Sequence, residues 1–336
     1  MGNTIPFSLR HMTPSTTYTM VQQSFFCGKP KWTTDDVPDL SGQVMIVTGG
    51  NAGVGRQTVK ALLEHHAKVY MASRNQKKAE AAIEELYEST GKRAVFLHLD
   101  LSDLLSVKRA AMEFLRVNLY LLFSKEQELH VLYNNGGIMV PPIQEATRTG
   151  YDLTFATNVL GHFYLTKLLL PILISTAQKL GTVRVVTITS MVHYVGTIKY
   201  DTFKDEPARR KRTPFDLYAQ SKWANAVFAV ELARRYGEQD IVATSVNPGN
   251  IRTDVARNST GLLTLFVKSI LIHPVEWGAV TQLWAGVSAE GAQLNGKYVA
   301  PWGRVAKHRR DVEDPERGRE LWDWLEEQVS SIPELN

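Results

Sequence analysis

Short apolar segments alternate with longer amphipathic segments along most of this chain. A short apolar run bounded by Gly, Asn or Asp is typical of a buried strand, whereas apolar positions repeating every three and four residues indicate a helix. Repeated strand–helix–strand units predict a parallel sheet covered by helices on both faces. We therefore expect an α/β fold with a single doubly wound parallel sheet of about seven strands. The expected strands are Val44–Val47, Lys68–Ser73, Ala94–Leu99, Val131–Tyr133, Val183–Thr189, Val242–Val246 and Lys297–Ala300, and the expected helices are Val54–His66, Gln76–Thr90 and, approximately, 103–125, 151–178, 215–237 and 275–289.

The domain organisation follows from where this alternation begins and ends. Residues 1–40 are rich in Thr, Ser and Pro without helical or strand periodicity, which predicts an irregular N-terminal arm. Residues 41–336 show no flexible linker and are expected to form one domain. Near its end, Leu321, Trp322, Trp324 and Leu325 lie on one face of an expected helix at about 315–330 that docks on the body.

Composition excludes several classes of partner. The only cysteine is Cys27, so no intrachain disulfide can form. Much of the net charge of +4 lies in the basic runs 208–212 and 304–310, which we interpret as solvated surface. No zinc-finger or RNA-binding pattern and no clustered metal-ligand spacing is present, so we expect neither a nucleic-acid partner nor a metal.

Membrane insertion is not expected either. The longest apolar runs, Leu168–Ile174 and Leu262–Ile272, are shorter than the roughly 20 residues that a spanning helix needs. The first thirty residues lack the apolar core of a secretory signal. We expect a cytoplasmic protein without a transmembrane segment; a weaker interpretation is peripheral membrane association through 262–272 and the basic runs.

A glycine-rich turn, Thr48-Gly49-Gly50-Asn51-Ala52-Gly53-Val54-Gly55, follows the first expected strand and opens the first helix. Glycines allow the backbone to approach a pyrophosphate closely, and the N-terminus of the helix offers free N–H groups and the positive end of its dipole. In this context the turn predicts a dinucleotide site and a Rossmann-type sheet.

The spacing Gly49-x-x-x-Gly53-x-Gly55 resembles the Thr-Gly-x-x-x-Gly-x-Gly pattern of the short-chain dehydrogenase/reductase family. Further motifs of that family follow in its order over roughly residues 40–300. They are Asp100-Leu101 after the third strand, Asn134-Asn135-Gly136-Gly137 after the fourth, Asn158 in the next helix, Ser190 after the fifth strand, Tyr218-x-x-x-Lys222, and Pro248-Gly249 with Thr253 after the sixth.

The resemblance implies a set of cofactor-binding residues and a cofactor. Because the second strand ends in Ser73-Arg74-Asn75 without an acid, we expect NADP(H) rather than NAD(H), with Arg74 and Arg56 on the 2′-phosphate. The full expected set is Thr48, Gly49, Asn51, Gly53, Val54, Gly55, Arg56, Arg74, Asp100, Leu101, Asn135, Gly136, Tyr218, Lys222, Pro248, Gly249 and Thr253.

The catalytic residues implied by the resemblance are Ser190, Tyr218, Lys222 and Asn158. Tyr218 and Lys222 are four residues apart, which on a helix places them on one face, where the cation is expected to lower the phenol pKa. Ser190 would orient the carbonyl, and Asn158 would hold a water between Lys222 and solvent. Thr189 also carries a hydroxyl, so Ser190 is assigned by alignment to the family's Ser-Ser-x-x-His pattern. His193 is expected to be structural and His162 a packing residue.

The stretch after Pro248-Gly249 is where the family builds its substrate lid, here about 250–275. Its apolar side chains suit a lipophilic carbonyl or alcohol, although the same segment could pack on the body or on a second subunit. Tyr194 and Trp302 are additional candidates for the pocket. The phrases Asn158–Phe163 and Pro248–Ile251 resemble the retinol-dehydrogenase-like branch and its fungal members, some of which act on terpenoid or polyketide intermediates.

Three alternatives stay open. The apolar stretch 116–123 departs from the family pattern and is either an interaction site or sequence retained from an intron. The family's helices at about 151–178 and 215–237 form a four-helix dimer contact, so a homodimer is expected unless Phe163, Leu168 and Leu169 belong to the core. The alternative to an enzyme is a non-catalytic, dinucleotide-binding regulatory or scaffold protein.

Overall fold

The computed structural model describes residues 13–25, 27–115, 117–118, 123–124, 126–251 and 273–333. At its centre is an eight-stranded sheet in the order β10-β9-β8-β7-β6-β1-β2-β3. Neighbouring strands pair in parallel, except that β10 pairs antiparallel with β9. The α/β doubly wound fold is confirmed, but β10 had not been expected. The strands are β1 Val44–Thr48, β2 Lys68–Ser73, β3 Val95–His98, β6 Val131–Asn134, β7 Val183–Ile188, β8 Ile241–Val246, β9 Tyr298–Ala300 and β10 Arg304–Ala306.

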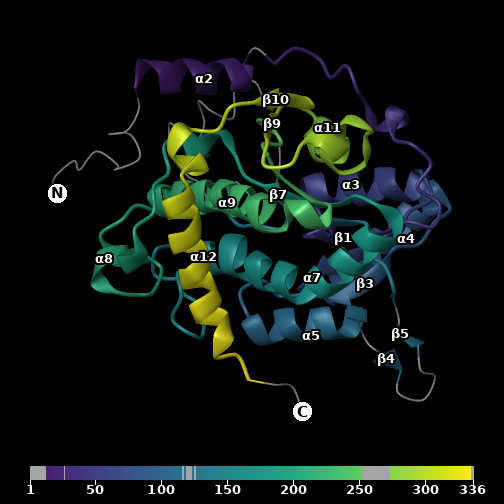
Figure 1. Cartoon of the computed structure of the whole chain (residues 1–336), viewed down its shortest axis with the longest axis horizontal. Helices are drawn as coiled ribbons and strands as arrows, with labels where there is room; N and C mark the ends of the chain where they lie inside the picture. Colours follow the sequence, from purple (N-terminus) through teal and green to yellow (C-terminus); the bar gives the residue numbers. More distant parts are fainter. Residues whose placement is uncertain are drawn as a thin grey trace.

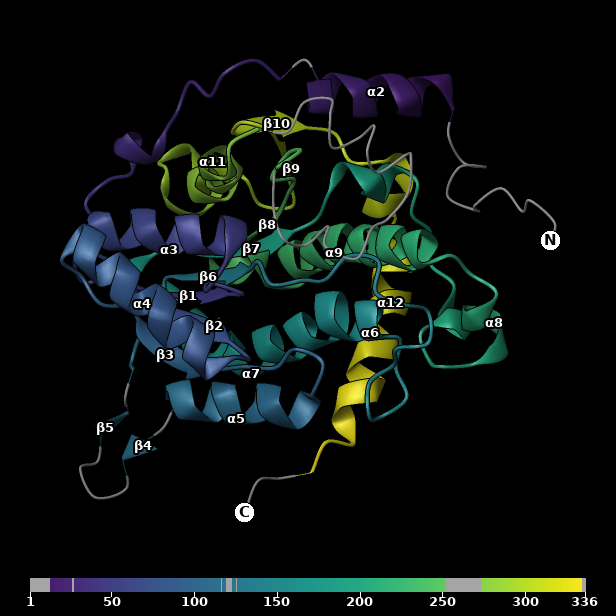
Figure 2. The same ribbon diagram turned by 180° about the vertical axis from the view of Figure 1, so that it is seen from behind.

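Helices cover both faces of this sheet (Figures 1 and 2). The helices α3 Gly53–Glu64, α4 Gln76–Thr90 and α11 Val275–Val287 lie on one face. The helices α5 Leu104–Leu115, α7 Gly161–Leu180 and α9 Pro214–Tyr236 lie on the other. Strand β1 is buried throughout because Ile46 joins the core on one face and Met45 and Val47 the core on the other.

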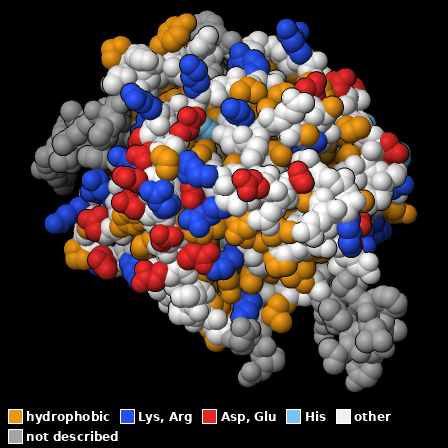
Figure 3. Space-filling view, in the orientation of Figure 1, with side chains coloured by type: hydrophobic (Ala, Val, Ile, Leu, Met, Phe, Trp, Pro, Cys, Tyr) orange, Lys and Arg blue, Asp and Glu red, His pale blue; other side chains and the backbone are white. Residues whose placement is uncertain are grey.

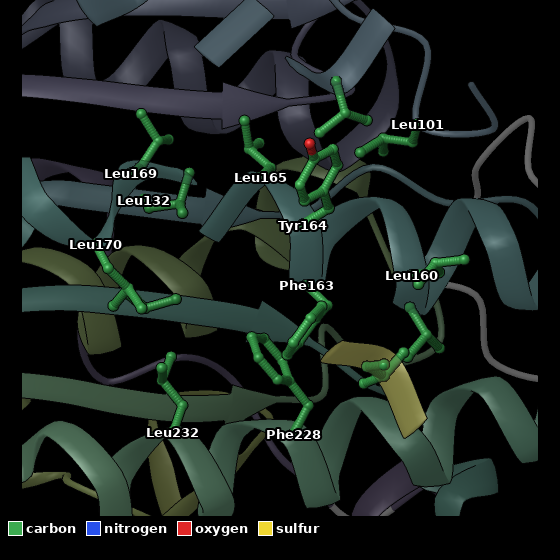
Figure 4. Close-up of a cluster of buried hydrophobic side chains, with 14 of the residues drawn as sticks. Leu101, Leu132, Leu160, Phe163, Tyr164, Leu165, Leu169, Leu170, Phe228 and Leu232 are labelled. Atoms are coloured by element: carbon green, nitrogen blue, oxygen red, sulfur yellow. The ribbon is translucent and has the colours of Figure 1, made fainter. Parts of the chain in front are cut away.

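The core between the sheet and α7 is dense in leucine and aromatic side chains. Figure 4 shows Leu165 and Leu169 pointing from α7 toward Leu132 of β6, with Phe163 against Phe228 of α9. The combined helical segment Leu153–Leu180 is long and apolar enough to cross a membrane, but 72% of its most apolar window is buried inside this fold. Its apolar surface is therefore used by the sheet and the neighbouring helices.

The C-terminal helix α12 Pro315–Ser330, at the position expected, crosses outside α9 and α7 (Figure 1). Trp322 packs against Phe163 and stacks on Phe228, with ring centroids 5.0 and 6.0 Å away. Lys167 of α7 pairs with Glu326. Part of the α7 and α9 surface that the expected four-helix dimer would use is thus covered by the chain's own C-terminus, and Phe163 and Leu169 are core residues.

Two expectations about secondary structure were wrong. The N-terminal arm contains a helix, α2 Pro14–Phe25, which docks on the segment after β7. The helix expected over 103–125 ends at Leu115, and β4 Val117–Asn118 and β5 Phe123–Ser124 form an antiparallel pair after it. Val and Asn both have low helix propensity, which favours termination there.

The basic run 208–212 was also misread as wholly solvated. The Arg209 side chain is only 1% exposed and forms an ion pair with the equally buried Asp152 at 2.8 Å. It also donates to the carbonyls of Ile143 and Glu145 and to Asp205. A buried guanidinium is tolerated because its donors are paired in this way. On the face shown in Figure 3, basic and acidic side chains are intermixed.

Candidate active site

The glycine-rich turn joins β1 to α3. Gly49 and Gly53 have φ of +65° and +54°, where a side chain would be strained. A Cβ on Gly55 would lie 2.4 Å from the Gly49 carbonyl oxygen, so this closely folded turn requires glycine. The N-cap of α3, Ala52, has no side chain that caps the helix, which leaves the first-turn N–H groups available to a phosphate. The backbone at Asn51–Gly55 thus fits a dinucleotide.

Thr48 fastens this turn to the end of β6. Its hydroxyl oxygen accepts hydrogen bonds from the N–H groups of Asn135 and Gly136 at 2.9 and 2.8 Å. The Asn135 amide donates in return to the Thr48 carbonyl at 2.8 Å. A Cβ on Gly136 would lie 2.9 Å from the side chain of Leu101, which packs there beneath the turn. These expected cofactor residues are therefore held together.

His162 connects this turn to Asn158. Its Nδ1–H donates to the Asn158 carbonyl at 3.0 Å, so its Nε2 is the acceptor that faces the Thr48 hydroxyl at 2.8 Å. Burial lowers the pKa of His162 to about 4, which keeps the ring neutral and this arrangement fixed. The residue expected to serve only as packing is thus a hydrogen-bonded bridge between the cofactor turn and the helical turn that carries Asn158.

Asn158 lies in a π-helical turn, η2 Ala156–Leu160, between α6 Leu153–Phe155 and α7. Such turns are frequent at functional sites. Its amide oxygen accepts from the Ile138 N–H at 2.9 Å, and its amide nitrogen donates to the Ile138 carbonyl and to the Ser221 hydroxyl, both at 3.0 Å. Asn158 therefore clamps the loop after β6 to the helix that carries Tyr218 and Lys222.

Tyr218 and Lys222 lie in the first turns of α9, whose start is fixed by a Thr213–Asp216 capping box and by Pro214. The Ser190 side chain lies near the Tyr218 hydroxyl, where it acts to lower the pKa of that group. The Lys222 Nζ lies 5.8 Å from the centroid of the tyrosine ring and donates to the Ile188 carbonyl at 3.0 Å. The structure thus brings together all three residues expected to perform the chemistry.

The charge states in this cluster differ from the expectation. Burial raises the pKa of Tyr218 to about 12, and only the neighbouring Ser190 side chain acts in the opposite direction. Burial also lowers the pKa of Lys222 to about 8. The pKa of the phenol is raised and not lowered as expected, because desolvation of the phenolate outweighs the stabilisation that the Lys222 charge can give. The site therefore holds a neutral phenol, which is the form that donates a proton.

The two hydroxyls at the end of β7 have different partners. The Thr189 hydroxyl is buried and donates to the Lys222 carbonyl at 2.6 Å, so it supports α9. Ser190 faces Tyr218 and begins the short helix η3 Met191–Tyr194. His193 donates from Nδ1 to the Ser190 carbonyl at 2.7 Å, and burial lowers its pKa to about 3. His193 is therefore structural, as expected.

The residues expected to hold the rest of the nucleotide lie at the ends of β2 and β3. Arg74 is exposed between β2 and α4. Arg56 is paired with Glu85 at 2.6 Å, in a partly exposed ion pair that had not been foreseen. The Asp100 carboxylate accepts from the N–H and hydroxyl of Ser102 at 2.9 and 2.6 Å. Arginine at the end of β2, with no acid there, fits a phosphorylated ribose.

The base of the expected lid lies next to the arm. Gly249 has a φ of +85°, and a Cβ there would lie 2.8 Å from the ring of Trp302. Ile251 and His273 form a parallel bridge, so the ends of the segment 252–272 meet. Thr253 and most of the lid lie outside the described residues. Tyr194 and Trp302, expected near the pocket, are buried packing residues.

Two residues that support the site, Asn225 and Gln23, were not predicted from the sequence. Asn225, one turn after Lys222, also donates to the Ile188 carbonyl at 3.0 Å. Gln23 of the arm hydrogen-bonds two tyrosines near Ser190. No local pattern marks either residue, although a polar residue within the buried run of α9 was a signal for Asn225. In the part of the chain that the structure describes, no group of three or more potential metal ligands occurs.

Comparison with known proteins places this site in a family. The pattern of the family described as short chain dehydrogenase matches residues 43–204. A short-chain dehydrogenase/reductase of Armillaria gallica is 52% identical over 303 residues, covering 90% of this chain and 95% of that protein. Retinol dehydrogenase 12 of Mus musculus is 34% identical over 304 residues, covering 89% of each.

Solved structures agree with this. An uncharacterized protein of Mycobacterium paratuberculosis superposes with a TM-score of 0.69 at 30% identity, covering 90% of this chain and 99% of that one. A blue fluorescent protein from a metagenomic library, in complex with NADPH, superposes with a TM-score of 0.57 at 26% identity, covering 79% and 98%. The chain belongs to the short-chain dehydrogenase/reductase family of oxidoreductases. Its similarity to fungal members and to a retinol dehydrogenase is confirmed.

Proposed function

We propose that this chain is an NADP(H)-dependent oxidoreductase that acts on a lipophilic carbonyl or alcohol. The observation that carries the proposal is the Ser190–Tyr218–Lys222 cluster beside the glycine turn, with Tyr218 kept neutral by burial. A non-catalytic regulator would have no use for a buried lysine whose charge is costly to desolvate. When bound, reduced nicotinamide supplies the hydride.

The residues of the chain then supply position and a proton. Ser190 and Tyr218 offer two adjacent hydroxyls that hydrogen-bond a substrate carbonyl oxygen. As negative charge develops on that oxygen, the Tyr218 hydroxyl transfers its proton to it. Lys222, charged below a pKa of about 8, stabilises the phenolate that remains. Ile188, Asn225 and Asn158 keep this lysine and its helix in place.

The preference for NADP(H) rests on charge. Arg74 is exposed at the end of β2, and in the part of the chain that the structure describes it forms no ion pair. Arg56 exchanges Glu85 for the 2′-phosphate in this proposal. The similar protein described in complex with NADPH supports the same choice.

The substrate class, pathway and location are further parts of the proposal. The apolar composition of residues 262–272 supports a lipophilic substrate, and the similarity to fungal relatives supports secondary metabolism of terpenoid or polyketide intermediates. We propose a cytoplasmic protein without a membrane span and without a nucleic-acid partner. A contact of 262–272 with a membrane surface is the alternative, and vesicle flotation tests it.

Cofactor binding is the direct test. Fluorescence titration of the purified protein with NADPH and NADH is expected to show tighter NADPH binding, weakened about tenfold or more in Arg74→Ala because a charge-assisted phosphate contact is lost. Arg93→Ala, at an exposed arginine paired with Glu84, is the matched control and should leave both affinities unchanged. Equal affinity for both cofactors in the wild type and in Arg74→Ala would reject the NADP(H) proposal.

A turnover assay distinguishes the proposed enzyme from a non-catalytic regulatory or scaffold protein. Lipophilic ketones and aldehydes are screened with NADPH, and the corresponding alcohols with NADP⁺. Oxidation or reduction of a member of the panel supports the enzyme. Tight NADPH binding with no turnover of any member supports the regulatory or scaffold protein instead.

A further inference from the structure

The N-terminal helix α2 contacts η3, the short helix that follows Ser190, although the two are about 170 residues apart in sequence. Met20 packs against the small buried cluster of Val192, Val195 and Ala219, and Tyr218 and Met191 pack against the same cluster. Met20 also packs against a second cluster, which contains Tyr194, Tyr298 and Ala300. Met20, Met191 and Tyr218 are all only partly buried. Figures 1 and 2 both show α2 lying across the end of the molecule that carries β10.

The arm is anchored there by specific hydrogen bonds. The Gln23 side chain is buried, accepts from the Tyr298 hydroxyl at 2.8 Å and donates to the Tyr194 hydroxyl at 3.3 Å. Tyr194 ends η3, the helix that begins directly after Ser190. The Trp302 indole donates to the Gly28 carbonyl at 2.9 Å and fastens the segment after α2.

The composition of this helix restricts what it can contact. Residues 13–25 contain no Asp, Glu, Lys, Arg or His. A neutral helix whose methionine packs on the same cluster as Tyr218 offers an uncharged, deformable contact without a partner for a charged group. An acidic or phosphorylated substituent placed there would lose its hydration without compensation.

We propose that α2 forms one wall of the substrate site, with Met20 as a specificity-determining residue for an uncharged, apolar substituent and Gln23 as the positioning residue that holds the wall against η3. This inference rests on the proposed function, because it assigns the substrate side of the same site. It adds a contribution from the arm, which lies before the nucleotide-binding turn in the sequence.

The test measures binding of ketones to the NADP⁺ complex by calorimetry, so that it does not depend on turnover. Gln23→Leu removes both hydrogen bonds at similar volume and is expected to weaken binding of an apolar aryl ketone about tenfold while leaving NADP⁺ affinity within about twofold. Gln22→Leu, the same substitution at the exposed neighbour, is the matched control and should change neither. Equal ketone affinity in the two variants would overturn the role of Gln23.

Met20 gives an independent test that does not depend on the anchor. Met20→Ala is expected to shift the ratio of affinities for a bulky over a slender methyl ketone in favour of the bulky one by about tenfold, and Met20→Trp to shift it the opposite way. An unchanged ratio in both variants, with thermal unfolding and NADP⁺ affinity preserved, would remove Met20 from the substrate site. A wild type that binds NADP⁺ but none of the ketones would instead reject the proposed function.

Discussion

Replacing Lys222 with methionine should make the folded protein more stable while making it inactive. Burial lowers the pKa of this lysine from 10.5 to about 8. Each pKa unit corresponds to about 1.4 kcal/mol, so holding the charge inside the fold costs about 3 kcal/mol at neutral pH. The variant also loses a charged hydrogen bond to Ile188 worth about 1.5 kcal/mol, but Asn225 still satisfies that carbonyl. The expected net gain at pH 7 is about 1–2 kcal/mol.

The stability difference between the Lys222→Met variant and the wild type is expected to change with pH. Between pH 8 and pH 10.5 the unfolded chain keeps a proton on Lys222 that the folded chain has lost. The wild type therefore becomes more stable with rising pH in this window, by about 1.4 kcal/mol per unit, and the methionine variant does not share that gain. Groups common to both proteins cancel in the difference. The advantage of the variant should have disappeared by about pH 9.5.

Urea unfolding followed by circular dichroism at pH 7 and pH 9.5 measures the two stabilities, and cofactor oxidation measures activity, which should fall at least about 100-fold. Lys77→Met, at an exposed lysine of α4, is the control and should change neither quantity. A Lys222→Met variant that is less stable than the wild type at pH 7, or whose stability difference is the same at both pH values, would refute the reasoning.

Four further results are expected. Thr48→Val should lower the free energy of unfolding by about 2–4 kcal/mol in urea unfolding, because it leaves two backbone N–H groups and His162 Nε2 unpaired; Thr48→Ser should restore it. Gly55→Ala should abolish NADPH binding in the same titration that detects it in the wild type, because its Cβ would lie 2.4 Å from a carbonyl oxygen. Light scattering should give a monomer of 37.7 kDa, because α12 covers part of the surface of α7 and α9, and a wild-type dimer would contradict this interpretation. Trp322→Ala should lower the free energy of unfolding by about 3–5 kcal/mol, because this ring packs between α12 and the core.

The sequence predicts the parts of this fold that repeat a local pattern. Strand β2 and helix α4 have the expected bounds because their periodicity and their flanking Ser-Arg-Asn and Gly residues are local signals. Strand β10 was missed because it is only three residues long and largely exposed. Helix α2 was missed because its polar sequence carries little periodicity, and its stability comes from contacts with distant residues such as Tyr298.

The candidate site likewise contains features that the sequence predicts and features that it does not. Motif spacing along the chain was sufficient to bring Ser190, Tyr218 and Lys222 together. The role of His162 depends on which atoms Thr48 and Asn158 present to it, and the pairing of Arg209 with Asp152 depends on a crossing of segments 57 residues apart. Tertiary contacts between single residues leave no periodic trace in the sequence. The pKa of Tyr218 is likewise raised by burial, and the four-residue spacing to Lys222 does not indicate how buried the tyrosine is.

The most direct test of the account is single-turnover reduction of a ketone by bound NADPH in Tyr218→Phe, with NADPH affinity measured on the same sample. The phenylalanine ring keeps the packing against Val192, Val195 and Ala219 and removes only the hydroxyl that faces Ser190. We expect NADPH affinity to stay within about twofold of the wild type and the rate of hydride transfer to fall at least about 100-fold, since the proton donor is gone. An unchanged rate in a variant that binds NADPH normally would contradict the claim that Tyr218 donates the proton.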